Sequence, residues 1–471
     1  MATPDPPRPL PIGQSDFGNL RRAGFRYVDK TRFAMQVLDG ATVQLYTRPR
    51  RFGKTLNLSM LRHFVEKCDE AREELFEGLE IWDERHGERY SRHFQRYPVI
   101  DLSFRTVKSK SWHDAQAAIR ALLREELRRL QAAGYCQDLN ASEQLELDTW
   151  LDPKAPIVEF QPMLRLLSKW LERESQAPVI ILVDEYDTPL HAAYRHEYYD
   201  EAIEFFRGLL TGGLKDNKSL YRGVLTGILR VAKEGLFSGL NNVGVFSITD
   251  EHASSSFGFT GEDVRMLAQE RGRVADLPGL EAWYNGYCFG AVSTESHGAT
   301  PGHIIYNPWS ILSYLNAPED GFRPYWINTS DNALLQDLIT GKEHRLGAEL
   351  TALMQGECID KPLQEYLVLR SLDWDQDGIW NFLFMAGYLR LEGAYDPQRE
   401  MQRFTVPNQE VATIYRHSFL QWLRSGLKRS SQGALELCEA IVRGDAEYAE
   451  EGLQELFFNV LSYNDLQRRH A

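Results

Sequence analysis

The sequence predicts an α/β fold in which helices cover both faces of a parallel sheet, with a mostly helical region after it. Strand and helix patterns alternate through the first half of the chain, which implies right-handed crossovers between parallel strands. The run Val179–Asp184 is apolar up to its last residue, as expected of a strand buried on both faces. After about Ser256 the apolar spacing becomes mostly helical.

The elements follow from this patterning in chain order. Strands are expected over residues 41–47, 97–104, 179–184, 220–228 and 243–248. Helices are expected over residues 54–65, 112–133, 158–175, 199–214, 262–271, 379–389, 411–423 and 434–442. The acidic stretch 140–156 is expected to be a loop. The Asn-Gly pair at 285–286 predicts a turn between aromatic residues.

Length and composition are typical of a multi-domain globular protein. The 471 residues exceed what one hydrophobic core usually supports. Apolar residues make up 43% and charged residues 25% of the chain, and the apolar runs are too short to span a membrane. The proline-rich N-terminus lacks the pattern of a secretory signal. The five cysteines are scattered, which gives no zinc-site spacing and favours a cytoplasmic chain with reduced thiols.

The strongest motif lies directly between the first expected strand and the first long expected helix. Residues 48–55 read Arg-Pro-Arg-Arg-Phe-Gly-Lys-Thr. A strand, a Gly-Lys-Thr turn and a helix form the context of a phosphate-binding loop, the P-loop or Walker A motif. Lys54 would reach the β- and γ-phosphates of ATP, and Thr55 would supply a hydroxyl to Mg²⁺. The backbone of the loop and the helix start would surround the phosphates through Arg50, Arg51, Phe52, Gly53, Lys54, Thr55 and Leu56.

The loop departs from the usual pattern at its first position, where Arg48 replaces a glycine. Pro49 fixes one backbone angle and partly takes over the role of that glycine in the turn. The alternative interpretation is a basic turn whose Lys54 points into solvent. Three arginines in one turn count against this alternative, because their charges repel unless phosphates relieve them.

The second motif is the acidic end of the strand 179–184, which has the Walker B pattern. Asp184 would bind Mg²⁺, and Glu185 would orient and deprotonate the attacking water. Tyr186 and Asp187 would line the cleft. The alternative is that these acids begin an exposed loop. Because one further strand–helix unit separates the two motifs, we expect them on neighbouring strands, where they would share one magnesium–triphosphate.

A third group of candidate residues ends the strand 220–228. Thr226 is placed like a polar sensor that holds the attacking water or the γ-phosphate. Arg230 and Lys233 follow closely and would stabilise charge on the transferring phosphoryl group. The alternative is that these are surface charges after a strand. The expected catalytic residues are therefore Lys54, Glu185, Thr226 and Arg230, and the expected metal ligands are Thr55 and Asp184.

Several further runs occur in the same order as in one known family. They are Pro11-Ile12-Gly13, Asp16-Phe17, Tyr27 to Thr31, Gly239 to Asn242, Trp283 to Tyr287, Tyr306 to Ser310, Gly387 to Leu389, Val406 to Glu410 and Leu461 to Asp465. With the two motifs above, they make the chain similar to the AAA-ATPase-like family, whose bacterial and archaeal members often carry a C-terminal PD-(D/E)XK nuclease-like domain. Similar proteins commonly have Arg-Pro-Arg-Arg-Phe-Gly-Lys in this loop, so Arg48 is compatible with nucleotide binding.

The resemblance implies four parts of the chain. They are an AAA-like P-loop ATPase core (1–255), a lid-like segment (256–320), a helical, winged-helix-like region (321–430) and C-terminal helices at the start of a missing nuclease-like domain (431–471). No acidic strand pair with a lysine follows Asp465, so no nuclease activity is expected. We expect the aromatic residues of 283–287 to pack in a core, Asn307-Pro308 to begin a helix or turn, and residues 27–31 to lie near the adenine.

The leading functional hypothesis is an ATPase whose Mg²⁺-dependent hydrolysis of ATP switches its conformation. One alternative is a nucleotide-binding scaffold that does not hydrolyse ATP. Another is an ATPase that partners a separate nuclease in nucleic-acid processing or defence. The net charge of −14 gives no support for nucleic-acid binding. AAA relatives often form rings with an arginine supplied in trans, so a homo-oligomer stays open, but the sequence assigns that role to no residue.

Overall fold

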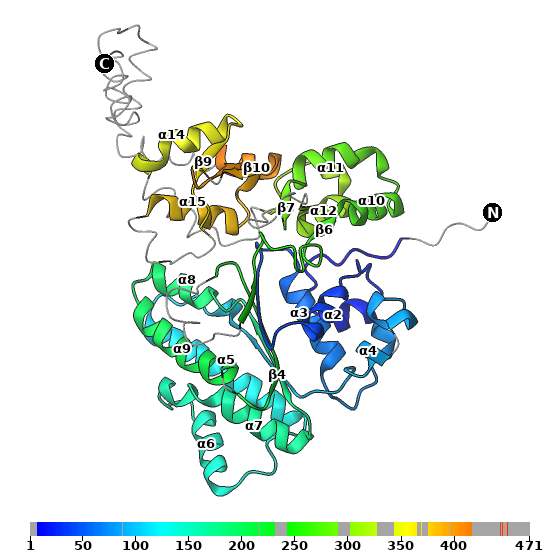
Figure 1. The fold of residues 1–471 in the computed structure, drawn as a ribbon, viewed down its shortest axis with the longest axis vertical. Coiled ribbons are helices and arrows are strands. Elements are labelled where there is room, and N and C mark those ends of the chain that lie inside the picture. Colours follow the sequence, from blue (N-terminus) through cyan, green and yellow to red (C-terminus); the bar gives the residue numbers. More distant parts are fainter. Residues whose placement is uncertain are drawn as a thin grey trace, which may run out of the picture.

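A computed structural model describes residues 7–86, 88–215, 217–230, 243–290, 302–326, 343–364, 375–396 and 398–416, with the single positions 369, 443, 445 and 450. Figure 1 shows a large sheet-and-helix core with a second, smaller group of helices and strands above it. None of the described helices is long and apolar enough to cross a bilayer. The expected helix at 434–442, Lys233 and the runs 239–242 and 461–465 lie outside the described residues.

The core contains one five-stranded parallel sheet with the order β2-β3-β4-β1-β5. Its strands are β1 (Val43–Thr47), β2 (Val99–Ser103), β3 (Val179–Asp184), β4 (Leu220–Gly227) and β5 (Val243–Phe246). The predicted α/β class is therefore confirmed. The expectation that the two motifs lie on neighbouring strands is wrong, because β4 pairs with both β1 and β3 and separates them.

Helices cover both faces of this sheet, as the alternating pattern predicts. In Figure 1, α2 and α3 lie on one side of the sheet and α8 and α9 on the other. The core helices are α1 (Phe17–Arg22), α2 (Arg32–Asp39), α3 (Lys54–Val65), α4 (Glu88–Ser91), α5 (Trp112–Ala132), α6 (Ala141–Leu151), α7 (Met163–Ser175), α8 (Thr188–Arg195) and α9 (Tyr199–Leu214). Short 3-10 turns occupy 73–75, 80–82, 84–86, 104–106 and 157–160.

The stretch 140–156 is not the expected loop, because most of it forms α6. Asn140 caps the helix by accepting hydrogen bonds from the backbone N–H groups of Ser142 and Glu143. The Glu143 carboxylate in turn accepts one from the Asn140 N–H, at 3.1 Å. A capping box is a known signal for the start of a helix, and the sequence analysis missed it because the stretch is rich in acidic residues. The charge of Glu143 is also satisfied inside the fold, because Arg173 on α7 pairs with it at 2.8 Å.

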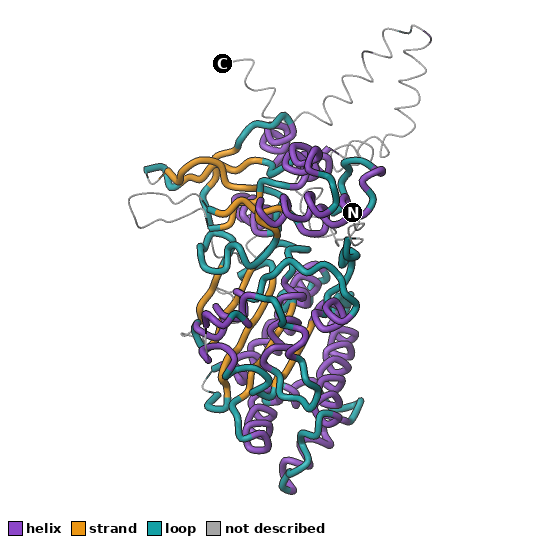
Figure 2. Tube along the Cα trace, turned by 90° about the vertical axis from the view of Figure 1, so that its right-hand side faces the viewer, coloured by secondary structure: helices purple, strands orange, loops and turns teal. Residues whose placement is uncertain are grey.

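The second group of elements combines helices with two small antiparallel sheets that the expectation of a mostly helical region did not include. One sheet has the order β6-β8-β7 and the other β10-β11-β9. Figure 2 shows the short strands of both sheets together, beyond one end of the large sheet. The strands are β6 (Phe259–Thr260), β7 (Tyr287–Phe289), β8 (His303–Tyr306), β9 (Ile359–Lys361), β10 (Arg390–Asp396) and β11 (Met401–Thr405). The helices are α10 (Gly261–Glu270), α11 (Leu277–Tyr284), α12 (Pro308–Asn316), α14 (Glu343–Met354) and α15 (Gln376–Met385), with 3-10 turns at 274–276 and 318–320.

Two hydrophobic cores correspond to this arrangement. The larger core fills the five-stranded sheet and the helices around it, and continues into α15 and β11. The smaller one lies between α10, α11 and α12, and includes Leu10 and Val28 from the N-terminal segment. The N-terminal segment therefore packs against α10 to α12 as well as against α3, where the Phe17 N–H donates to Ser59 at 2.9 Å. This placement brings residues 11–15 to the mouth of the phosphate-loop region.

Candidate functional site

The turn between β1 and α3 has the backbone conformation that a phosphate-binding loop requires. Gly53 adopts φ 87° and Arg51 φ 69°, so both lie in the left-handed region, which only glycine enters at no cost. The first N–H groups of α3 are free of intrahelical partners by geometry and face the turn. The Lys54 side chain is 5% exposed and folds back, so that its Nζ donates to the Arg48 and Pro49 carbonyls at 3.0 Å each.

This position of Lys54 rules out the alternative of a lysine that points into solvent. Burial lowers the pKa of the Lys54 ammonium, and the nearby carboxylates of Glu185 and Asp184 oppose that shift. The two hydrogen-bond partners of Nζ are carbonyls, which carry only partial charge. A buried cation that lacks a directly bonded carboxylate is well placed to bind an anionic ligand.

Asp184, the last residue of β3, connects α3 to the neighbouring strand β4. Thr55 at the start of α3 donates its hydroxyl to Asp184 Oδ2 at 2.7 Å. Thr226 near the end of β4 donates to Asp184 Oδ1 at 2.5 Å. The carboxylate is 3% exposed, and burial, followed by the charge of Glu185, raises its pKa. The structure therefore brings together three of the residues that the sequence analysis selected, although they lie up to 171 positions apart.

Glu185 follows Asp184 in a strained backbone conformation. Its φ is 50°, which is unusual for a residue with a side chain and is found more often at functional sites. The side chain is partly exposed and lines the pocket described next. Thr188 at the start of α8 donates its hydroxyl to Glu185 Oε2 at 3.1 Å. A carboxylate held at the edge of a pocket by one hydroxyl can accept a proton from water.

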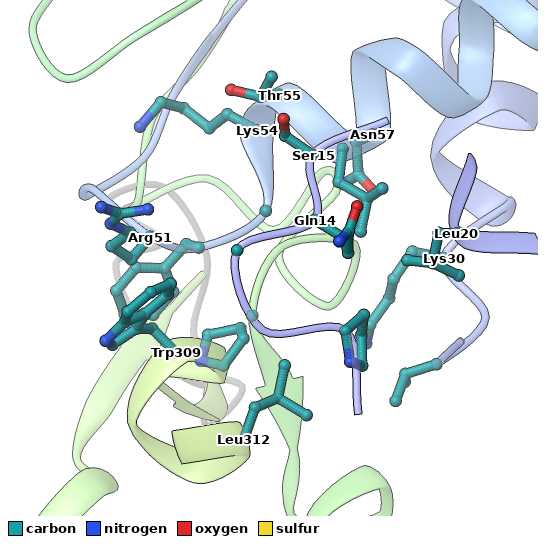
Figure 3. A pocket seen from close by; sticks show the side chains of 18 of the residues that line it. Gln14, Ser15, Leu20, Lys30, Arg51, Lys54, Thr55, Asn57, Trp309 and Leu312 are labelled. Carbon is teal, nitrogen blue, oxygen red and sulfur yellow. The ribbon is translucent and has the colours of Figure 1, made fainter. Parts of the chain in front are cut away.

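A pocket of about 280 Å³ opens beside this turn. Its lining combines the P-loop, the N-terminal segment, the segment after β2 and the start of α12. Figure 3 shows Lys54 and Thr55 on one side of it, Gln14 and Ser15 beside them, and Trp309 and Leu312 on the side of α12. Tyr27, Val28 and Lys30 also line it, and the expected proximity of residues 27–31 to the adenine stays a prediction. The apolar part of the lining includes Pro11, Ile12, Phe259, Pro308 and Leu312.

The loop end of the pocket is strongly cationic. Two basic lining residues are already paired, since Arg26 contacts Glu270 at 2.7 Å and Lys30 contacts Asp263 at 2.8 Å. The basic residues at the loop end are Arg50, Arg51, Lys54, Arg105 and Lys108. Among the described residues that line the pocket, Glu185 is the one acidic side chain. Such an excess of positive charge around α3's N-terminus suits a polyphosphate.

The other selected residues have different environments from those expected. Arg48 does not face the pocket: it is fully buried and donates to the carbonyls of Thr47 at 2.8 Å and Phe246 at 2.9 Å. Burial lowers its pKa to about 10. The repulsion argument from three arginines therefore applies to Arg50 and Arg51 alone. Leu56 lines the pocket as expected.

Tyr186 and Asp187 do not line the pocket either, contrary to the expectation. Both are buried, and both hold the chain just after β4. The Tyr186 hydroxyl donates to the Leu229 carbonyl at 2.5 Å. Asp187 Oδ2 accepts from the backbone N–H groups of Ile228 at 2.7 Å and Leu229 at 2.9 Å. These two side chains fix the end of β4 and with it the position of Thr226.

Arg230 is placed less favourably than the sequence analysis expected. It is partly exposed, and the described pocket lining includes neither Arg230 nor Thr226. Thr226 is fully buried beneath Asp184, so its first contact is with that carboxylate and not with the pocket. The structure thus supports Thr226 as a residue that positions Asp184.

The P-loop contacts the C-terminal elements through three of its residues. The Phe52 ring packs edge-on against Tyr287, with ring centroids 4.9 Å apart. The Arg51 guanidinium lies over the Trp309 indole at 4.5 Å from the ring centre, as Figure 3 shows. A Cβ atom added to Gly387 would come within 2.9 Å of Pro49 Cβ, which explains glycine there together with its φ of 88°.

Three of the matching runs meet behind these contacts. Asn307 caps α12 by accepting from the Trp309 N–H at 2.9 Å, so the expected helix start is confirmed. Tyr284 and Tyr287 are buried in the two cores, which confirms the expectation of core packing. Glu410 is fully buried here and accepts from Ser310 Oγ at 2.8 Å and the Trp326 N–H at 2.8 Å. Burial raises the pKa of Glu410 to about 7.

The raised pKa of Glu410 predicts how the free energy of unfolding depends on pH. In the unfolded chain Glu410 titrates near 4.5, and in the folded chain near 7. Between these values the unfolded chain has lost a proton that the folded chain retains, so stability falls as pH rises from about 4.5 to 7 and is flat above. The loss from this one group is roughly 3 kcal/mol. Glu410→Gln keeps the shape without the charge, and its free energy of unfolding, measured with urea from pH 5 to 8, is expected to lack this fall. Parallel pH profiles for the two proteins would contradict the prediction.

The residues around the turn fit ATP and Mg²⁺. The cationic loop end and the buried Lys54 suit phosphates, and the Thr55 hydroxyl and the Asp184 carboxylate are the oxygen ligands that Mg²⁺ prefers. Within the described ranges no group of three or more His, Cys, Asp or Glu side chains could hold a metal alone. A metal that takes most of its ligands from phosphate and water is consistent with this donor set.

Comparison with known proteins gives four findings. A family description, "Predicted AAA-ATPase", matches residues 11–237. An "uncharacterized protein in vnfD 5'region" of Azotobacter chroococcum is 31% identical over 420 residues, which span 87% of this chain and 70% of the relative. Among solved structures, a Walker-type ATPase of Pyrococcus abyssi matches with a TM-score of 0.39 at 12% identity, over 87% of this chain and 98% of the other. The ORC2 protein of Aeropyrum pernix, solved in ADPNP–ADP complexes, matches with a TM-score of 0.25 at 11% identity, over 83% of this chain and 92% of the other.

Proposed function

Because the chain belongs to the predicted AAA-ATPase family, we propose that it binds ATP with Mg²⁺ beside Lys54 and hydrolyses it to switch its conformation. The observation that carries this proposal is the hydrogen-bonded group of Thr55, Asp184 and Thr226. It joins the P-loop helix to the acidic strand end, which supports one shared site for the phosphates and the metal. The resemblance of the two motifs to Walker A and Walker B supports the same assignment.

Each residue then has a defined task. Lys54 turns from the Arg48 and Pro49 carbonyls to the β- and γ-phosphates, and the backbone of residues 50–56 surrounds them. Thr55 and Asp184 would hold Mg²⁺, which would neutralise charge on the phosphates when bound. Thr226 keeps Asp184 in place. Glu185 accepts a proton from the attacking water.

The contacts of the P-loop support a switch. Pro49, Arg51 and Phe52 touch Gly387, Trp309 and Tyr287 respectively. Loop residues that must adjust to the γ-phosphate are therefore packed against the C-terminal elements. The loss of that phosphate would change these contacts and so shift α12 and its neighbours relative to the core. The order of β9, α15, β10 and β11, with the sheet order β10-β11-β9, supports the winged-helix-like assignment of this region.

Phosphate release from ATP tests the proposal. The purified chain is expected to release phosphate steadily with Mg²⁺ and to stop when EDTA removes the metal, because without the cation the Asp184 carboxylate adds to the negative charge of the phosphates. Calorimetric titration of ATP measures binding in the same preparations. Binding without any release would favour the non-hydrolysing scaffold, and no binding at all would contradict the proposed function.

A further inference from the structure

The short segment that follows β2 carries two basic residues that the sequence analysis did not select. It begins directly after Ser103, which pairs in register with Asp184 on β3. It includes a 3-10 turn over Phe104–Thr106. Because β2 and β3 are parallel, this segment leaves the sheet at the same edge as Glu185. It therefore lies on the Walker B side of the pocket and not on the side of α12.

The segment is fixed on its inner side. Phe104 is fully buried, and its ring packs edge-on against Phe206 of α9 with centroids 5.0 Å apart. Val107 is 1% exposed. At the end of the segment, the Tyr198 hydroxyl donates to the Ser109 carbonyl at 2.7 Å. These three anchors hold the backbone between residues 104 and 109 in one position.

Arg105 and Lys108 alternate with these anchors and line the pocket. Arg105 is exposed, and within the described ranges it forms no ion pair or hydrogen bond. Burial is the largest cause that lowers the pKa of the Arg51 guanidinium, and the nearby charge of Arg105 is the second. An arginine that is presented by a fixed backbone, lacks a counter-charge and lies near another cation is stabilised by an anion between them.

We propose that Arg105 is a catalytic residue of its own chain, which contacts the γ-phosphoryl group and stabilises the charge that develops during transfer. The inference rests on the proposed function, since it names a further group of the same site. A water oxygen forms the new bond to the γ-phosphorus while the bond from that phosphorus to the β–γ bridging oxygen breaks. The water proton goes to Glu185, and the bond electrons leave with ADP. Arg105 moves no proton and contributes its fixed charge.

This assignment replaces the role that the sequence suggested for Arg230. Both residues follow strands of the same sheet, but Arg105 lines the pocket whereas Arg230 does not. The inference also concerns the chain's assembly. A cation supplied by the segment after β2 of the same subunit removes the need for an arginine from a neighbour.

The test compares Arg105→Ala and Arg105→Lys with the control Arg128→Ala, whose arginine is exposed on α5 away from the pocket. Arg105→Ala is expected to lower kcat for MgATP by about 100-fold or more, the usual effect of losing one charge-stabilising donor. Binding of a non-hydrolysable ATP analogue and the thermal unfolding midpoint are expected to change little. Arg105→Lys is expected to restore part of kcat. If the wild type is active and Arg105→Ala has the same kcat, this inference is wrong but the proposed function stands. If the wild type is itself inactive, both the inference and the proposed function are contradicted.

A mixing experiment tests whether the arginine acts within its own chain. Lys54→Ala chains retain Arg105 but are expected to be inactive themselves. Mixed in excess with Arg105→Ala chains, they are expected to restore no phosphate release. Recovery of activity on mixing would show that Arg105 acts across subunits and would contradict the proposal.

Discussion

Replacement of Glu185 by glutamine is expected to lower steady-state phosphate release by about 100-fold or more while MgATP still binds. The amide keeps the size of the side chain and can still accept from Thr188, but it cannot take a proton from water. The contribution of a positioned general base is typically about 100- to 10,000-fold. The measurement is kcat from phosphate release, together with a calorimetric binding constant for ATP.

A matched control for this substitution is Glu125→Gln, which removes an exposed carboxylate from α5. Its kcat is expected to equal that of the wild type. If Glu185→Gln keeps full turnover, another group activates the water. If both binding and turnover disappear, Glu185 has a structural role at its strained position, where φ is 50°.

Replacement of Lys54 by alanine is expected to remove most of the affinity for ATP. Hydrogen bonds to a charged group contribute about 1.5–3 kcal/mol each, so the loss of two phosphate contacts predicts a decrease of at least about 100-fold. Calorimetry with ATP and Mg²⁺ measures this change directly. Phosphate release is expected to fall below detection at the same nucleotide concentration.

The apo protein provides a check on the Lys54 substitution. Without nucleotide, Nζ contacts only the carbonyls of Arg48 and Pro49 among the described residues, and burial already disfavours its charged form. Thermal unfolding of the unliganded variant is therefore expected to resemble that of the wild type. Lys169→Ala, on the exposed side of α7, serves as the control for loss of a lysine. Unchanged ATP affinity in Lys54→Ala would contradict the P-loop assignment.

Local sequence signals predicted much of the core. The helix after the P-loop and the helix 199–214 have the predicted bounds, and the strand 179–184 is β3. These elements have strong periodicity or continuous apolar runs, so local patterning determines them. The expected helix 158–175 instead divides into a 3-10 turn and α7 at Pro162, because proline restricts the residue before it.

The strand order could not be predicted in the same way. Whether β4 lies between β1 and β3 depends on long-range packing, and no residue near either motif encodes it. The hydrogen bond from Thr226 to Asp184 depends on that order, and so does the placement of Arg105 beside Glu185. Arg48 and Asp187 were misassigned for a related reason: a charged residue next to a motif looks functional in sequence, although its partners here are buried backbone groups.

The most direct test of the account is a crystal structure with Mg²⁺ and a non-hydrolysable ATP analogue. It is expected to show the triphosphate at the start of α3, with Lys54 turned to the β- and γ-phosphates. The metal should lie on the Thr55 hydroxyl, with Asp184 beside it and Arg105 on the γ-phosphate. A nucleotide bound elsewhere, or one that leaves Lys54 on the Arg48 and Pro49 carbonyls and Asp184 without the metal, would contradict it.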